Sequence, residues 1–180
     1  ARRTWHYFER FVTEEDHWLP PDNVQEVPER RIAHRTSPTN IGMGLLSTLA
    51  AHDMGYLDTY QLADRLEKTL TAVESLERHE GHLLNWYETT SLAALYPRYV
   101  STVDSGNLVG ALMTLATGLR QLCDEPEREE RLCAGAADAA GVLSESLSAL
   151  SDRMHAATPL RQRFGAARRE VEALRGNLGG

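Results

Sequence analysis

The sequence predicts an all-α fold of helical hairpins that form part of an (α/α)6 barrel, or toroid. The main observation is a stretch that occurs twice, because residues 35–50 recur in outline 66 positions later as residues 101–116. Each copy is a hydroxyl-rich polar segment followed by a small-residue apolar segment, as expected for loops that begin the inner helices of a toroid. In addition, apolar and polar residues nowhere alternate for the length of a typical strand.

The elements follow from start and stop signals. Apolar spacing predicts a first helix over residues 4–15, and a proline-bearing loop follows over residues 18–34. Ser37 can cap the next helix, and Pro38 costs no hydrogen bond in its first turn. Gly55 is a plausible end of that helix.

The second half repeats this pattern. Asp58 with Gln61 forms a capping-box pattern at the start of the next helix, which we expect to end at Gly81. The second copy of the repeat predicts a helix from Thr102 or Asp104 to about Leu122. Two further helices, starting at Pro126 and Leu160 and rich in Ala, Arg and Glu, are expected to be outer scaffold.

Composition excludes several classes of function. The net charge of −7 comes from interspersed acidic and basic residues, which argues against a nucleic-acid partner. No apolar run is long enough to span a bilayer, and no targeting segment is recognisable. Cys123 and Cys133 have neither metal-ligand nor redox spacing, and no motif implies a cofactor or a metal.

The candidate site lies in the two loops at the repeated helix starts and in the aromatic loops beside them. Sugar hydroxyls require groups that donate and accept hydrogen bonds, and the C–H faces of sugar rings stack on aromatic rings. The predicted substrate-binding residues are Trp18, Asp22, Asn23, His34, Arg35, Thr36, Ser37, Asn40, Asn85, Trp86, Tyr87, Arg98, Tyr99, Thr102, Ser105 and Asn107. The alternative for each of them is a role limited to capping or core packing.

Four linked motifs carry a family resemblance. They are Trp18-Leu-Pro-Pro-Asp-Asn, His34-Arg-Thr-Ser-Pro-Thr-Asn-Ile-Gly, Gly81-His-Leu-Leu-Asn-Trp-Tyr and Pro97-Arg-Tyr-Val-Ser-Thr-Val-Asp-Ser-Gly-Asn-Leu. In order and spacing over residues 3–122 they resemble the central region of cyclic β-1,2-glucan synthases. That resemblance implies an (α/α)6 barrel that cuts and rejoins β-1,2-glucan chains and closes them into rings with retention at the anomeric carbon.

The resemblance also limits what this chain supplies. Retaining chemistry needs two carboxyl groups, and Asp104 is the candidate catalytic residue because it lies in a family-like entrance motif. The essential glutamates of the family are expected in a later part of the barrel. Glu88 stands where the family has Asp, so no role is transferred to it. We therefore expect about half a barrel from a larger multidomain protein, with sugar-binding loops and no activity alone.

The expected partners are a β-glucan oligosaccharide or polysaccharide and the remainder of the barrel or a self-association surface. The resemblance places the parent protein on the cytoplasmic side or at the inner membrane, without direct membrane insertion by this segment. Two other interpretations stay open. One is a non-catalytic helical interaction module, and the other is a metal-dependent phosphohydrolase built on His52-Asp53 with His34, His79 and His82.

Overall fold

The chain folds into helices with very little strand, which confirms the all-α class. The computed structural model describes residues 1–124, 129–153 and 159–178. Its helices are α1 (Arg2–Phe11), α2 (Pro38–Asp53), α3 (Thr59–Ser75), α4 (Thr102–Asp124), α5 (Glu129–Arg153) and α6 (Pro159–Leu178), with one 3-10 turn, η1 (Glu14–Asp16). Its two-residue strands are β1 (Val24–Gln25), β2 (Arg31–Ile32), β3 (Arg35–Thr36), β4 (Arg78–His79), β5 (His82–Leu83) and β6 (Tyr87–Glu88).

The caps expected from the sequence form as predicted. The Ser37 hydroxyl accepts a hydrogen bond from the amide of Asn40 at 3.3 Å, and Pro38 occupies the first turn of α2. Asp58 and Gln61 form a reciprocal capping box at the start of α3. These local signals fix where the two helices begin.

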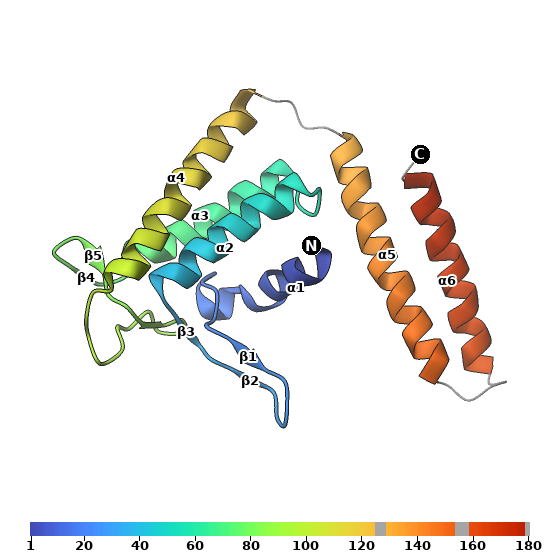
Figure 1. The fold of residues 1–180 in the computed structure, drawn as a ribbon, viewed down its shortest axis with the longest axis horizontal. Coiled ribbons are helices and arrows are strands. Elements are labelled where there is room, and N and C mark those ends of the chain that lie inside the picture. Colours follow the sequence, from blue (N-terminus) through green and yellow to red (C-terminus); the bar gives the residue numbers. More distant parts are fainter. Residues whose placement is uncertain (125–128, 154–158, 179–180) are drawn as a thin grey trace.

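Helix α2 is the central element, with α1, α3 and α4 packed around it (Figure 1). Its buried residues form a broad face of the helix, as expected for a helix in contact with several neighbours. The main core joins α2, α3 and α4 to the loops, and a smaller cluster of Trp5, Ala51 and Leu57 lies under α1.

Helices α2 and α4 run side by side and in parallel from the loop-bearing end of the molecule (Figure 1). A Cβ atom added to Gly42 would lie 2.9 Å from the Cβ of Ala111, and one added to Gly118 would lie 2.7 Å from a Leu49 methyl carbon. Small residues therefore let the two repeat helices approach closely, which offsets their low helix propensity.

The other side of α4 is open. Added Cβ atoms at Gly106 and Gly110 would meet nothing within 4 Å, and Val103 and Met113 are 69% and 67% exposed. Within the described residues, therefore, the glycines of α4 are only partly explained by packing.

Two boundaries differ from those expected. The first helix ends at Phe11, and η1 follows it. Helix α3 ends at Ser75, and Gly81 instead forms the two-residue turn between β4 and β5, together with Glu80. Both turn residues have positive φ, 48° for Glu80 and 85° for Gly81. Positive φ at both positions is typical of a type I′ turn, whose backbone twist matches that of the two strands it joins. Pro126, the expected start of the next helix, lies outside the described residues.

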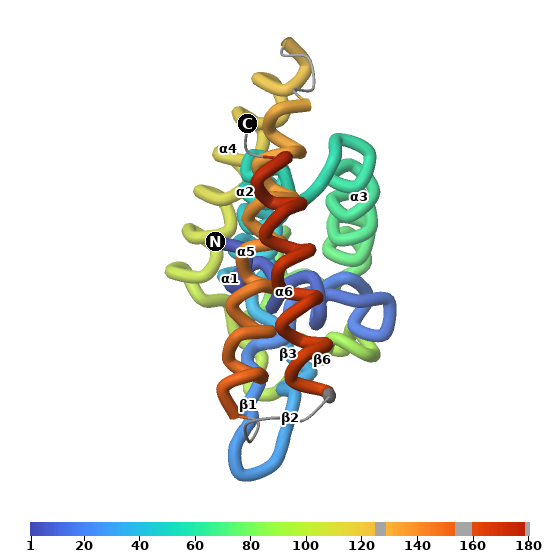
Figure 2. The backbone as a smooth tube through the Cα atoms, turned by 90° about the vertical axis from the view of Figure 1, so that its right-hand side faces the viewer, coloured from blue at the N-terminus to red at the C-terminus, as the bar shows by residue number. Residues whose placement is uncertain are grey.

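Helices α5 and α6 form an antiparallel hairpin that lies against the end of α2 and beside α1 (Figure 2). The backbones of Gly55 and Gly135 touch, because a Cβ atom added to Gly135 would lie 2.1 Å from the Gly55 carbonyl oxygen. Tyr56 donates a hydrogen bond to Asp138, and an Arg131 nitrogen lies 3.2 Å from Nε2 of the buried His52. Across the described helices, none combines the length and apolar character needed to cross a membrane.

Candidate functional site

The starts of α2 and α4 meet through three polar side chains. The hydroxyl of Thr39 donates a 2.6 Å hydrogen bond to Oδ1 of Asp104 and accepts one at 3.1 Å from Nδ2 of Asn107. The amide of Asp104 is capped by the Ser101 hydroxyl at 3.2 Å. The parallel arrangement of the two repeat helices thus brings their polar entrances into direct contact.

Asn85 extends this contact to two aromatic residues. Its side-chain oxygen lies 2.7 Å from both the Trp86 indole nitrogen and the Tyr99 hydroxyl, and its nitrogen lies 2.9 Å from Oδ2 of Asp104. We assign this orientation of the amide because an indole N–H can only donate and a carboxylate can only accept. Asn85 is buried, whereas Tyr99 is 46% exposed.

The other side of the site is formed by Arg35. Its guanidinium binds Oδ2 of Asp22 through two nitrogens, at 3.2 and 2.9 Å, and lies 4.8 Å from the centre of a Trp86 ring. Asp22 also accepts hydrogen bonds from Asn23 at 3.0 Å and from Asn40 at 3.4 Å. The Trp86 side chain therefore links the Arg35 pair to the α4 entrance.

We call this connected set the entrance cluster. It offers carboxylates, amides, a guanidinium, hydroxyl groups and partly exposed aromatic rings, which is the mixture that recognises sugars. Its members are Asp22, Asn23, Arg35, Thr39, Asn40, Asn85, Trp86, Tyr99, Asp104 and Asn107. All of them except Thr39 are among the predicted site residues, and Thr39 lies within the predicted motif that begins at His34.

The environment of Asp104 favours its charged form. Partial burial alone would raise the pKa of this carboxyl, but hydrogen bonds from the side chains of Ser101, Thr39 and Ser37 outweigh it, so the pKa is lowered from the ordinary 3.8. A general acid needs the opposite shift, because it must carry a proton near neutral pH. The geometry therefore suits Asp104 for holding the two entrances together.

Asp104→Asn is expected to weaken the acid dependence of stability. Because the folded-state pKa lies below the unfolded value, Asp104 stabilises the fold above that unfolded value, and this contribution is lost as pH falls through the folded pKa. Urea unfolding of both proteins at pH 7 and at about pH 3 measures this. The wild-type chain should lose more free energy of unfolding than the variant, and equal losses would contradict the assignment.

The pairing of β3 with β6 divides the remaining site residues between two faces. Arg35 lies opposite Glu88 and Thr36 lies opposite Tyr87, so Thr36 and Tyr87 share the face turned away from Arg35. Thr36 and Tyr87 are both 0% exposed, and the Tyr87 hydroxyl is used by the Glu77 carbonyl and the Leu84 amide. In contrast to the expectation, these two side chains offer no surface to a ligand.

The other expected residues are not members of the entrance cluster, although some lie next to it. Ser37 is buried as the α2 cap, and its side chain also hydrogen-bonds Asp104, whereas Arg98 forms an ion pair with Glu77 beside the β4–β5 hairpin. Trp18 packs along α3, where the nitrogen of Lys68 lies 4.4 Å from its ring centre. Thr102 and Ser105 lie in the first turn of α4, close in sequence to Asp104.

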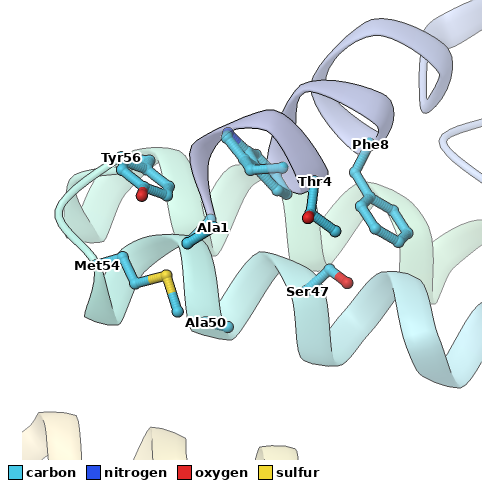
Figure 3. Close-up of a pocket in the computed structure, with 9 residues that line it drawn as sticks. Ala1, Thr4, Phe8, Ser47, Ala50, Met54 and Tyr56 are labelled. Carbon is cyan, nitrogen blue, oxygen red and sulfur yellow. The ribbon is translucent and has the colours of Figure 1, made fainter. Parts of the chain in front are cut away.

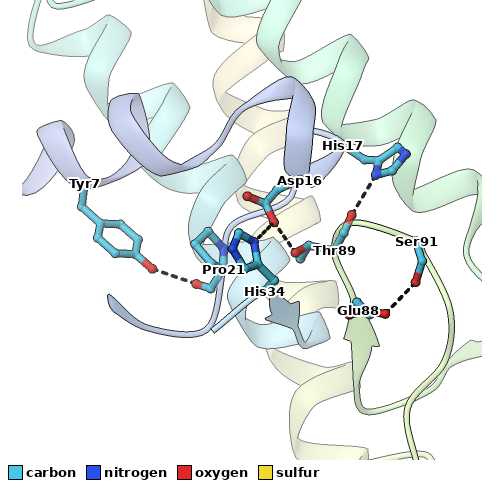
Figure 4. A network of polar contacts seen from close by, with 8 residues as sticks. All are labelled: Tyr7, Asp16, His17, Pro21, His34, Glu88, Thr89 and Ser91. Carbon is cyan, nitrogen blue, oxygen red and sulfur yellow. Dashed lines mark hydrogen bonds and ion pairs between the residues drawn. The ribbon is translucent and has the colours of Figure 1, made fainter. Parts of the chain in front are cut away.

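Sequence reasoning missed a buried carboxylate. Asp16 is 4% exposed, and its Oδ1 accepts hydrogen bonds from Nδ1 of His34 at 2.8 Å and from the Thr89 hydroxyl (Figure 4). The neighbouring His17 contacts the Thr89 carbonyl at 2.7 Å. These partners are far away along the chain, so no local pattern could have found the network. His34 therefore anchors β3 to η1, on the face away from Arg35.

A separate pocket of about 200 Å³ lies between α1 and α2, with Trp5, Phe8, Ala50 and Met54 among its lining residues (Figure 3). Most of its lining residues are apolar, and the hydroxyl groups of Thr4 and Ser47 are among the few polar side-chain groups there. This pocket therefore differs from the entrance cluster, which is densely polar. Of the histidines of the phosphohydrolase interpretation, His79 and His82 are paired in the β4–β5 hairpin, whereas His52 is buried in α2 and His34 binds Asp16. In the described parts of the chain, no group of three or more His, Cys, Asp or Glu residues is placed to hold a metal ion.

Comparisons with known proteins agree with this fold. Cyclic beta-(1,2)-glucan synthase NdvB of Rhizobium meliloti (strain 1021) is 44% identical over 163 residues, which are 90% of this chain and 6% of that protein. A solved candidate glucoamylase of Bacteroides fragilis NCTC 9343 matches 67% of this chain and 33% of its own, with a TM-score of 0.52 and 20% identity.

The first of these matches confirms the resemblance to cyclic β-1,2-glucan synthases, and the second shows the glucoamylase-like helical-barrel fold. The chain spans only a small part of the synthase and a third of the solved protein. A family model described as "Protein of unknown function (DUF3131)" matches residues 1–121, which contain α1 to α3 and nearly all of α4. The chain therefore belongs to the DUF3131 family.

Proposed function

We propose that this chain is the saccharide-binding part of an enzyme that cleaves and rejoins β-1,2-glucan chains and closes them into rings. The observation that carries the proposal is the entrance cluster, in which Arg35, Trp86 and Asp104 come together from three separate segments. The 44% identity to a cyclic beta-(1,2)-glucan synthase supports β-1,2-glucan as the proposed ligand of the cluster.

Within that enzyme the chain binds and orients the glucan. The two carboxylates of the cluster are already used, since Asp22 is paired with Arg35 and Asp104 accepts hydrogen bonds from α2 and α4. Cleavage of a glycosidic bond requires a protonated carboxyl at the leaving oxygen. We therefore infer that neither residue is the general acid, and that Asp104 contributes by positioning Asn85 and Thr39.

The open face of α4 supports a place within a larger barrel. Val103, Val109 and Met113 are more than half exposed, and the solved neighbour is about three times as long as the part that this chain matches. Further helices that pack on this face would complete the inner layer. The apolar face is also the specific observation that favours the alternative function, a non-catalytic helical interaction module.

Calorimetric titration with a linear β-1,2-gluco-oligosaccharide tests the proposal, with a β-1,3-glucan of equal length as the control. We expect the β-1,2-gluco-oligosaccharide to bind and the β-1,3-glucan not to bind. Trp86→Ala should weaken the affinity for the β-1,2-gluco-oligosaccharide about tenfold, or about 1.4 kcal/mol, because it removes the aromatic ring that contacts Arg35. Tyr60→Ala is the matched control, because Tyr60 is 80% exposed on α3 and outside the cluster. Equal affinity for both glucans, or an equal effect of both variants, would refute the proposal.

A further inference from the structure

A groove of about 510 Å³ runs between the turn that contains η1 and the second half of α3. Trp18, Ala72 and Leu92 supply its apolar lining, and His17 and Glu67 are among its polar lining residues. This groove, which we call the Trp18 groove, shares no residue with the entrance cluster. The β3–β6 pair and the Asp16 network lie between the two sites, because the network joins His17 to the strand pair through Thr89.

The backbone of the groove is unusual. Non-glycine residues with positive φ are rare, yet three of them line this groove, namely His17 at 51°, Trp18 at 59° and Leu92 at 61°. The amides of His17 and Trp18 bond to the carbonyls of Glu14 and Thr13, at 3.0 and 2.8 Å, which is a Schellman turn. That turn requires one left-handed residue, usually glycine, so it explains His17 but leaves Trp18 unexplained.

Long-range hydrogen bonds hold both residues in place. The Trp18 carbonyl accepts a 2.9 Å bond from the Thr69 hydroxyl on α3. Nδ1 of His17 lies 2.7 Å from the carbonyl oxygen of Thr89, which can only accept, so Nδ1 carries a proton. In the neutral tautomer that has this proton, Nε2 is an acceptor. The fold thus fixes an indole and an imidazole acceptor side by side at the lining of one groove.

Two cations lie near the Trp18 indole. Arg65 lies 5.7 Å from the ring centre and is not part of the groove lining, whereas Lys68 lies 4.4 Å from it and belongs to the lining. Lys68 pairs with Asp64 at 2.7 Å, and both of these partners are about 40% exposed. Such surface pairs contribute little, so a ligand can displace the lysine from the ring. Glu14 and Glu67 add carboxylates to the lining. An aromatic platform bordered by carboxylates and an imidazole acceptor suits a neutral ligand with several hydroxyl donors.

We propose that the Trp18 groove is a second saccharide-binding site, which holds a sugar ring of the same glucan at a distance from the entrance cluster. This inference rests on the proposed function for the identity of the ligand. The Trp18 indole is the stacking platform, and the carboxylates and Nε2 of His17 accept hydrogen bonds from sugar hydroxyls. A second point of attachment would increase the retention of a long glucan chain through effective concentration.

The three tryptophans allow both sites to be observed in one experiment. The chain is labelled with ¹⁵N, and its indole N–H signals are assigned with single Trp→Phe variants and followed during titration with a linear β-1,2-gluco-oligosaccharide. We expect the signals of Trp18 and Trp86 to shift, while that of Trp5, which is 4% exposed, stays constant and reports on the fold. In Trp86→Ala the Trp18 shift should persist, and in Trp18→Ala the Trp86 shift should persist.

The outcomes separate the two proposals. A Trp18 shift that survives Trp86→Ala supports the second site, even if the entrance cluster proves inactive. A shift of Trp86 alone leaves the proposed function intact and overturns the second site, as does a Trp18 shift that disappears in Trp86→Ala. If Trp86→Ala disturbs the Trp5 signal, calorimetry with a β-1,2-gluco-oligosaccharide too short to bridge the two sites decides instead, because Trp18→Ala should then reduce the stoichiometry from two oligosaccharides per chain to one. An unchanged stoichiometry would overturn the second site.

Discussion

Gly55→Ala is expected to lower the free energy of unfolding by about 3 kcal/mol and to displace the α5–α6 hairpin. Gly55 has a φ of 71°, and an added Cβ atom would lie 1.9 Å from the carbonyl oxygen of Arg131. An alanine at this position would be strained by the left-handed backbone conformation, and its Cβ atom would clash with backbone atoms of α5. Relieving the clash would require the whole α5–α6 hairpin to move, because the hairpin packs directly against this glycine. Urea unfolding measures the loss of stability.

A spectroscopic signal reports the displacement itself. Burial, and then the hydrogen bond to Asp138, raise the pKa of Tyr56 from 10.0 to about 12. When the hairpin moves away, this pKa should return towards 10.0, which an ultraviolet titration compared with Tyr56→Phe detects. Gly106→Ala is the matched control. It lies in α4 with nothing within 4 Å of the added atom, so it should stabilise the chain by up to about 1 kcal/mol. Equal effects of both substitutions would contradict the observed docking of α5.

Asp16→Ala is expected to cost about 3 kcal/mol, because it leaves two donors without their buried acceptor. The Thr89 side chain is fully buried, and Nδ1 of His34 is directed at the same carboxylate oxygen. The loss should also loosen the β3–β6 pair, since His34 and Thr89 directly flank its paired residues. Thermal or urea unfolding measures the first effect, and hydrogen exchange of the Thr89 amide, which bonds to the His34 carbonyl at 3.0 Å, measures the second.

Asp22→Ala provides the comparison, because it removes the carboxylate that is paired with Arg35, the residue next to His34. Its partner Arg35 is 51% exposed, and exposed ion pairs contribute about 1 kcal/mol or less. Asp22→Ala should therefore leave stability nearly unchanged while it releases Arg35 in the entrance cluster. If Asp22→Ala destabilises the chain as much as Asp16→Ala does, burial is not what gives the Asp16 network its importance.

Much of the site could be predicted from the sequence because its parts are local. The repeat placed hydroxyl-rich entrances at Ser37 and Thr102, and the helices begin within a residue of them. Residues in these entrances were expected to face one ligand, and Arg35, Asn40, Asp104 and Asn107 do meet there. The roles of these residues towards glucan stay predictions that the binding experiments address.

Alternation within short strands accounts for the main difference at the site. Thr36 follows Arg35 in the same motif, yet a strand directs successive side chains to opposite faces, so one is buried and the other is exposed. Two-residue strands leave too short a pattern for this to be read from sequence. Trp18 was likewise grouped with the entrance loops by its motif, whereas its left-handed backbone turns it towards α3.

The sequence by itself determined the all-α class, the starts of α2, α3 and α4, and the family, since caps, apolar periodicity and linked motifs act over a few residues. Only the tertiary structure decided that α2 and α4 join their entrances through Thr39 and Asp104, that Asp16 is buried, and that Trp18 forms a separate groove. These features depend on contacts between segments 18 to 73 positions apart. Such contacts form only once the core has packed, because buried carboxylates and left-handed residues are stable only where the surrounding structure supplies their partners.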